Sequence, residues 1–517
     1  MTPPPPAKRP RRWIWHPLAF ALSPIVALYA ANADLVAVAD IGRSAAMALA
    51  VAGILWALLA ALTRSAEKAA LLASVALFAF FFWGHFVHQF ISSAQVFNKT
   101  PYFIAYFSFF LLLDFALLFL RSLRAPTRFF HVCGGLLLAF PLLSLALRGL
   151  AAGPSNSAGR TANGAAEWAA ADAADFPRRD VFVLLLDGYP RADVLRDDYF
   201  FDNTPFLDAL RARGFHVVEN SHANYPKTLW SLGATLNGAH LRDLIEMDDP
   251  DSRDLRPLLD LVKNNRVFRF FARHGFSLYA FETGFDVAEM RGSVHHFLSP
   301  RSWGNEFDSL VLQLTPVPAL AQRISGNAPL FDKHRKRVRF TFNTLKAMPE
   351  HPAETPRFVW AHVILPHDPI VFGAGGEPRQ IQERFVWGDA PPAHLPWPDY
   401  AAQYAAQLGY LNGLVLEALD SILQTTRPEP LIVVFSDHGP HNLLHQDCGS
   451  HFKNLCAIRV PAEIPWTPVD HLDLVNLFPF LLNALGASEK PIPLAEESRR
   501  YRVDWDRPYQ LNPCESP

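Results

Sequence analysis

Five apolar stretches fill most of the first 149 residues and constrain the fold more than any other feature. They lie at about 13–32, 44–63, 69–92, 101–120 and 130–149. Each is close to the ~20 residues that an α-helix needs to cross a bilayer. The first is long for a cleaved signal peptide, and no small-residue cleavage site is followed by a folded domain. We therefore expect a transmembrane domain of about five helices in residues 1–149.

Lysine and arginine are unevenly distributed between these stretches. With the N-terminus inside, the inner segments carry Lys8, Arg9, Arg11, Arg12, Arg64, Lys68, Arg121, Arg124 and Arg128. The outer segments carry little more than Arg43 and Lys99. Positive residues favour the cytoplasmic side of a membrane. The pattern predicts a multi-pass protein of the cytoplasmic (inner) membrane, whose residues from 150 onward face the periplasm or the exterior.

One acidic residue, Asp114, falls within the fourth apolar stretch. An acid inside a membrane is a candidate functional residue. The same position also suits a protonated or paired acid within the helix bundle. The sequence leaves both interpretations of Asp114 open.

The rest of the chain has the composition of a soluble protein. Residues 150–175 are rich in Ala, Gly, Ser and Asn, which predicts a flexible linker, and the soluble domain is expected at 176–517. A formal net charge of −2 gives no indication of nucleic acid binding. The four cysteines show no CxxC spacing. Cys448 and Cys456 could form a disulfide in an exported domain or remain two thiols.

Two apolar runs in the soluble half stop abruptly at polar residues. The run at 181–186 ends at Asp187 and Gly188, and the run at 431–435 ends at Ser436-Asp437-His438-Gly439. A third, at 358–365, is followed by His367. Such strands alternate with helical segments, which predicts an α/β domain with a mainly parallel sheet between helices. Ligands of such sheets lie beyond the carboxyl ends of the strands, so these polar residues are expected at one edge.

A threonine, Thr228, stands where a loop turns into a helix, and the N–H groups at a helix start favour an anion. Asp187, Asp437 and His438 offer hard oxygens and an imidazole, which suit a divalent metal such as Zn²⁺ or Mn²⁺. A metal would favour the alkoxide of Thr228, which could attack phosphorus or sulfur to give a covalent ester. Lys227 could stabilise the negative oxygens or be a solvated lysine.

Each of these pieces has an ordinary alternative when taken alone, because Asp-Gly is common in turns and Asp-His-Gly often follows strands. Their joint occurrence, in this order and with Thr228 at a helix start, favours the functional interpretation. His367 could serve the substrate or a second metal, or be a loop histidine. Three later histidines compete for one or two remaining ligand roles, and His451 is preferred because it lies just ahead of a strand; they are His441, His445 and His451.

These residues together resemble the alkaline phosphatase/sulfatase superfamily. The layout of spans followed by such a domain is similar to lipid A phosphoethanolamine transferases and lipoteichoic acid synthases. The motif matches lie between about 180 and 460. The resemblance implies Asp187 as the first acidic metal ligand, Thr228 as the nucleophile, Asp437 and His438 as a ligand pair, His367 beside the substrate or a second metal, and His451 as a later histidine of the two-metal members.

The chain also departs from parts of this pattern. Sulfatases carry a Cys/Ser-x-Pro-x-Arg motif, whereas Thr228 is followed by Leu-Trp-Ser; formylglycine chemistry is therefore not expected. The disulfide set common in phosphoethanolamine transferases is missing. The segment between His438 and His451 is short, which leaves one or two metal ions open.

Three functions remain in competition. The first is transfer of a phosphoethanolamine- or phosphoglycerol-type group from a membrane phospholipid, through Thr228, to an envelope glycolipid or glycan. The second is hydrolysis of phosphate or sulfate esters. The third is a non-catalytic envelope protein that retains the fold as a binding module. The five spans favour the first, because both of its substrates would be amphiphilic, and the intact set of site residues disfavours the third.

Overall fold

The computed structural model of the chain forms two compact units. We call Met1–Gly153 with Gly304–Asn327 the helical unit, and Pro154–Trp303 with Ala328–Pro517 the α/β unit. The structure describes residues 13–92, 100–151, 160–161, 168, 178–246, 251–301, 303–325, 328–351, 353–379, 385, 387, 395–445, 447–486, 491–496 and 499–514. The predicted inner residues Lys8, Arg9, Arg11 and Arg12 and the outer Lys99 lie outside these ranges.

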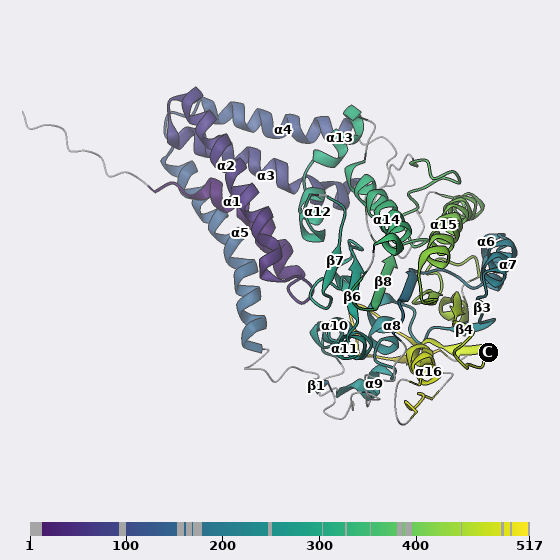
Figure 1. Ribbon diagram of the computed structural model, residues 1–517. Helices are drawn as coiled ribbons and strands as arrows, with labels where there is room; N and C mark the ends of the chain where they lie inside the picture. The colour runs from purple at the N-terminus through teal and green to yellow at the C-terminus, as the bar shows by residue number, and fades with distance from the viewer. Residues whose placement is uncertain are drawn as a thin grey trace, which may run out of the picture. The chain divides into compact units, whose positions relative to one another are not determined.

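The helical unit contains seven α-helices among the described residues (Figure 1). They are α1 (His16–Ala31), α2 (Gly42–Thr63), α3 (Ala66–Phe86), α4 (Thr100–Leu118), α5 (Arg124–Ala151), α12 (Glu306–Gln313) and α13 (Val317–Ser325). Four segments, which contain α2 to α5, are long and apolar enough to cross a membrane. The predicted first span becomes α1, which has only 16 residues. Thus four helices, rather than five, reach spanning length. Asp114 lies half-buried in α4.

The predicted linker lies mostly outside the described residues. Two short pieces of it belong to the α/β unit. β1 (Arg160–Thr161) pairs antiparallel with β5 (Ile245–Glu246). The ring of Trp168 lies 6.5 Å from that of Phe270, and a Cβ at Gly238 would come within 2.7 Å of Trp168. The segment is therefore fixed to the α/β unit at these two places.

A seven-stranded sheet forms the centre of the α/β unit, in the order β3-β10-β9-β2-β8-β6-β7. The strands are β2 (Val181–Leu186), β3 (His216–Val217), β6 (Ser277–Phe281), β7 (His296–Leu298), β8 (Arg357–Val363), β9 (Leu431–Phe435) and β10 (Cys456–Arg459). Only the pairs made by β10 are antiparallel. The three central strands β2, β8 and β9 are buried throughout, which explains their continuous apolar runs.

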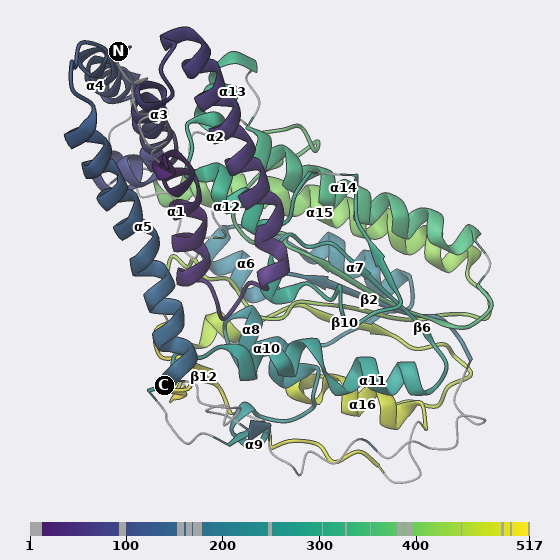
Figure 2. The same cartoon turned by 90° about the vertical axis from the view of Figure 1, so that its left-hand side faces the viewer.

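Helices cover both faces of this sheet (Figure 2). On one face lie α6 (Ala192–Tyr199), α7 (Thr204–Ala212), α14 (Pro329–Ala347) and α15 (Trp397–Thr425). On the other lie α8 (Thr228–Thr235), α10 (Arg256–Lys263), α11 (Arg266–Arg273) and α16 (Leu477–Ala484). The short elements are α9 (Leu241–Leu244), the parallel pair β4 (Asn220–His222) and β11 (His471–Asp473), and the antiparallel pair β12 (Tyr501–Arg502) and β13 (Asn512–Pro513). The predicted fold class is confirmed.

The cysteines pair differently from the alternative that the sequence left open. Cys448 forms a disulfide with Cys514. Cys456 is a free thiol, buried in β10 between β9 and β3, and burial raises its pKa to about 12. Cys448 and Cys456 therefore do not form a disulfide with each other.

Candidate metal centre and nucleophile

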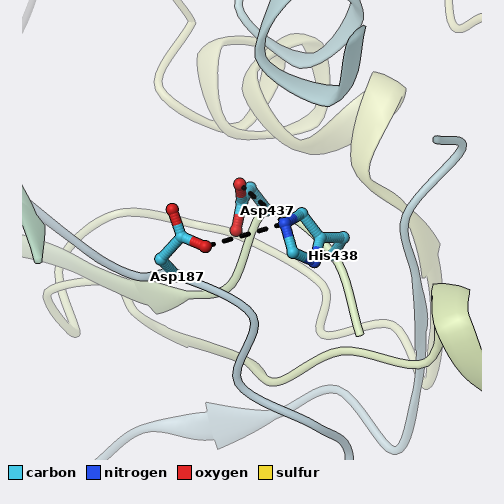
Figure 3. Close-up of side chains that lie close together, drawn as sticks. All are labelled: Asp187, Asp437 and His438. Carbon is cyan, nitrogen blue, oxygen red and sulfur yellow. Dashed lines mark ion pairs between the residues drawn. The ribbon is translucent and has the colours of Figure 1, made fainter. Parts of the chain in front are cut away.

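The ends of β2 and β9 bring two aspartates and a histidine together. Asp187 directly follows β2, and its backbone N–H donates to the carbonyl of Val363 at 3.0 Å. Asp437 and His438 follow β9, the parallel neighbour of β2. The backbone N–H of Gly188 donates to Asp437 Oδ1 at 3.2 Å, which ties the two strand ends to each other. Figure 3 shows the carboxylates of Asp187 and Asp437 and the ring of His438 turned toward one another.

Three ligand atoms from these residues converge. His438 Nε2 lies 3.6 Å from Asp187 Oδ1 and 3.5 Å from Asp437 Oδ2. One ligand atom of each residue lies within 4.8 Å of the other two, and all three side chains are buried. This is the spacing at which a single cation could touch all three atoms.

The hydrogen bonds around these atoms leave room for a cation. Within the part of the chain that the structure describes, Asp187 Oδ1 and Asp437 Oδ2 are buried without a hydrogen-bond donor. His438 Nδ1 lies 2.6 Å from the carbonyl oxygen of Gly439, so in a neutral ring the proton belongs on Nδ1. Nε2 then directs a lone pair toward two carboxylate oxygens. Three converging lone pairs in a buried site suit a divalent metal, because buried polar atoms without a partner are energetically costly.

The two carboxylates have opposite pKa shifts. Burial alone would raise the pKa of Asp187, but the hydrogen bond with His362 and the charges of nearby histidines hold it below its ordinary value. Burial and the adjacent charge of Asp187 raise the pKa of Asp437. The two acids therefore repel each other in the absence of a cation, and a divalent ion would relieve this repulsion.

Thr228 begins helix α8 beside these ligands. Its Oγ1 lies 3.4 Å from Asp187 Oδ2 and 3.4 Å from His438 Nε2. One turn later, the hydroxyl of Ser231 donates to the carbonyl of Asp437 and fixes α8 against the end of β9. The first N–H groups of a helix have no acceptor within the helix, so this end of α8 suits an anion. A hydroxyl, a candidate metal and an anion-binding helix end thus meet at Thr228.

One residue at this site, His362, was missed by the sequence reasoning. It lies within β8, and its Nε2 is 2.9 Å from Asp187 Oδ2. Its side chain is buried. A lone histidine inside an otherwise apolar buried run was the available signal, because such a run accommodates a polar ring only where the ring has a partner.

His367 lies beside Gly188. A Cβ at Gly188 would lie 3.5 Å from His438 and 3.6 Å from His367, so this glycine lies between the two rings. The ring of His441 is 4.5 Å from that of His438 and 5.2 Å from that of His367. Burial and the charges of His438, His367 and Lys227 lower the pKa of His441 well below its usual value. His367, His438 and His441 thus form a cluster of rings at the site.

The other predicted candidates are not part of the group formed by Asp187, Asp437 and His438. His451 is half-buried, and its Nδ1 lies 2.8 Å from the carbonyl of Pro440. The backbone of His451 packs closely against Gly439, where a Cβ would lie 2.8 Å from the His451 carbonyl oxygen. Lys227 Nζ lies 5.7 Å from the ring centroid of Trp505. His445 is exposed and pairs with Asp198 at 3.0 Å.

Comparisons with known proteins give a fold likeness only. No protein-family model and no curated protein matches the chain. Similar solved structures include the C-terminal periplasmic domain of EcEptC from Escherichia coli in complex with Zn, with 13% identity and a TM-score of 0.42 over 66% of this chain and 94% of that one.

Two further similar structures carry the names of groups that the sequence resembles. The lipoteichoic acid synthase LtaP from Listeria monocytogenes is 13% identical, with a TM-score of 0.38 over 65% of this chain and 80% of that one. A protein in the alkaline phosphatase superfamily from Vibrio parahaemolyticus is 13% identical, with a TM-score of 0.37 over 63% and 70%. With TM-scores below 0.5, these likenesses say nothing about substrate or mechanism.

Proposed function

We propose that the protein is a metal-dependent enzyme that transfers a phospho-alcohol group through a covalent intermediate on Thr228. The observation that carries this proposal is the position of the Thr228 hydroxyl, buried and 3.4 Å from both Asp187 and His438. Each of the two carboxylates at this site has one oxygen without a donor among the described residues. A buried threonine at a helix start beside them has no evident role in packing. It has the surroundings of an activated nucleophile.

The residues that would hold the metal are Asp187, Asp437 and His438, with Thr228 as the fourth ligand. The ion, Zn²⁺ or Mn²⁺, would act as a Lewis acid that favours the ionised hydroxyl and neutralises the phosphoryl oxygens. In a two-metal form of the site, His367 and His451 would hold the second ion. His362 would hold Asp187 in its orientation, as a hydrogen-bond partner of a metal ligand usually does.

The chain's own residues would then carry out the transfer in two displacements. In the first, Thr228 Oγ forms a bond to phosphorus, and the bond from phosphorus to the diacylglycerol oxygen breaks. The threonine loses its proton, and the diacylglycerol oxygen gains one. The N–H groups at the start of α8 would bind the phosphoryl oxygens. In the second, an acceptor hydroxyl loses its proton and bonds to the phosphorus of this threonine phosphodiester. The bond from phosphorus to Thr228 Oγ breaks, and Thr228 regains a proton.

The proposed substrates follow from the membrane segments. Four helices of spanning length indicate a membrane protein. A membrane phospholipid as donor and an envelope glycolipid or glycan as acceptor suit an enzyme that is anchored in the membrane. We place it in the cytoplasmic membrane with the α/β unit facing the periplasm or exterior, in agreement with the lysine and arginine distribution.

A covalent adduct on Thr228 would test this function. The full-length protein is incubated with vesicles of phosphatidylethanolamine and phosphatidylglycerol, then digested, and the peptide containing Thr228 is examined by mass spectrometry. A phosphoethanolamine or phosphoglycerol mass supports transfer and identifies the group, whereas bare phosphate would favour a phosphatase. Thr228→Ala is the control. An unmodified peptide in a preparation that contains metal, with Thr228→Ala as active as wild type, would contradict the proposal.

A further inference from the structure

Residues 304–325 come from the middle of the soluble half of the sequence but belong to the helical unit. The chain leaves the α/β unit after Trp303, forms α12 and α13, and returns at Ala328. Figure 1 shows α13 at one end of α4 and α12 near the same end of α3. The two units are therefore joined by the chain at three places rather than one.

Helix α12 is fixed to the bundle by a satisfied buried carboxylate. Asp308 accepts a hydrogen bond from the hydroxyl of Ser44 and lies 3.5 Å from the guanidinium of Arg43. It also forms a capping box with Asn305, whose side-chain amide donates to the carbonyl of Asp40 at 3.0 Å. These contacts join the start of α12 to the start of α2.

Apolar packing and one close backbone approach complete the attachment. Phe307 is fully buried in the same cluster as Phe20 and Phe81 of the bundle. The backbone N–H of Gly84 donates to the carbonyl of Leu314 at 2.8 Å. A Cβ at Gly84 would lie 2.5 Å from the carbonyl oxygen of Gln313. Only glycine allows α3 to approach the end of α12 this closely.

The polar and backbone contacts all fall at one end of the alternating helices. The partners are Asp40, Arg43 and Ser44 at the start of α2, Gly84 near the end of α3, and Thr100 at the start of α4. In a bundle whose helices alternate in direction, these ends share one side of the membrane. The end of α5, from which the chain continues into the α/β unit, is on that same side. The segment therefore lies at the same end of the bundle as the end of α5.

Helix α13 has an apolar face without cover among the described residues. Val317, Leu320 and Ile324 follow helical spacing and are 37%, 37% and 84% exposed. At its far end, Arg323 donates to the hydroxyl of Thr100 at 2.8 Å, which holds α13 at the start of α4. Helix α4 also exposes apolar side chains, at Ile104 and Phe109. Helix α13 is thus held at the start of a helix that itself exposes apolar side chains.

We propose that α13 lies in the membrane interface, with Val317, Leu320 and Ile324 inserted among the lipids. Short amphipathic helices bind membranes in this way, with an apolar face below the headgroups and polar residues above it. The position of α13 at the helix ends places this face at headgroup depth rather than in the hydrocarbon core. The segment would be a second membrane attachment of the soluble half, held in place by α12. This inference does not depend on the proposed catalytic function.

Lipid contact at residue 324 tests the proposal directly. Ile324→Cys and Asp470→Cys, whose native side chain is 84% exposed on the α/β unit, are labelled with a thiol-reactive fluorophore. Both are reconstituted in vesicles of phosphatidylethanolamine and phosphatidylglycerol. The wild-type chain, treated identically, gives the background from Cys133 and Cys456. One quencher is a phospholipid with a nitroxide near its headgroup, and the other is aqueous iodide.

The label at 324 should be quenched several-fold more by the nitroxide lipid than the label at 470, and several-fold less by iodide. Equal behaviour of the two labels would overturn the proposal. Protection of 324 from both quenchers would also overturn it, because protein and not lipid would then cover the face. In the labelled Ile324→Cys background, Gly84→Ala should displace the segment and weaken lipid quenching. The matched Gly53→Ala, where a Cβ meets nothing within 4 Å, should leave it unchanged.

Discussion

Each unit of the molecule buries an aspartate at a junction between distant segments, and the two carboxylates are treated differently. Asp308 of the helical unit receives donors from Ser44 and Asn305 and lies beside Arg43. Asp437 of the α/β unit receives the N–H of Gly188 on one oxygen, while the other oxygen has no donor among the described residues. A buried acid with all its donors holds a structure together. A buried acid such as Asp437, whose second oxygen lies near another carboxylate and an imidazole nitrogen, is suited to binding a cation.

The largest difference between the two sites should be in activity. Thr228→Ala removes the proposed nucleophile beside Asp187 and His438. It should reduce release of the headgroup from fluorescent phosphatidylethanolamine by on the order of 10⁴-fold or more. Thr228→Ser, which keeps a hydroxyl, should retain part of the activity. Asp308→Asn should leave the rate per folded molecule nearly unchanged. Equal rates for Thr228→Ala and wild type would remove threonine from the reaction.

The next effect concerns the histidine that the sequence did not reveal. His362→Gln should weaken metal affinity by roughly 10- to 100-fold, because the ring that orients Asp187 is lost. Titration with Zn²⁺ against a competing chelator measures this. His274→Gln, at another buried histidine whose Nδ1 lies 2.8 Å from the Phe270 carbonyl, is the control and should bind metal like wild type. If both variants bind normally, His362 is only a packed core residue.

For stability, we expect the opposite: substitution of Asp308 should destabilise the fold, although it leaves activity and metal binding unchanged. Asp308→Asn disrupts the contacts with Ser44 and Arg43 and should lower the free energy of unfolding by about 1–3 kcal/mol, measured by thermal denaturation in detergent. Metal content per folded molecule should not change. Asp420→Asn, in a partly exposed pair with Arg213, should cost less than about 1 kcal/mol. A loss of metal in Asp308→Asn would mean that the two regions are coupled.

The last effect is a pH dependence of stability that only the metal-free protein should show. The raised pKa of Asp437 means that the folded state holds its proton more tightly than the unfolded state. Stability from this group is therefore greatest at low pH and is lost as the pH rises through the raised pKa. After chelation, Asp437→Asn should gain about 1–3 kcal/mol over wild type near neutral pH and little near pH 3. A difference independent of pH would contradict the repulsion between the two acids.

Much of the candidate site could be predicted from local sequence. Apolar runs that end at Asp187 and at Asp437-His438, with Thr228 at a helix start, were enough, because parallel strands deliver their carboxyl ends to one edge. His362 was not found, because a histidine inside a buried run is more often a core residue with a partner. His441 lies against His438 and His367, a proximity that depends on the fold of the loop after β9 and not on its sequence spacing.

Long-range packing explains what the sequence did not reveal about the fold. Residues 304–325 have no feature that separates them from the soluble half, and their place in the helical unit depends on contacts with residues more than 200 positions earlier. The Cys448–Cys514 disulfide was also hidden, because pairing cannot be deduced from spacing. The first apolar stretch was overestimated, because hydropathy alone does not show where a helix begins and ends.

The metal content of the purified full-length protein tests the central claim most directly. Wild type and Asp437→Asn are purified in parallel from membranes, without chelators, and their metals are measured by elemental mass spectrometry. We predict about one equivalent or more of Zn or Mn in the wild type and its loss in the variant, with Asp308→Asn retaining the wild-type amount. A folded wild-type protein that carries no metal and binds none when Zn²⁺ or Mn²⁺ is added would contradict the account.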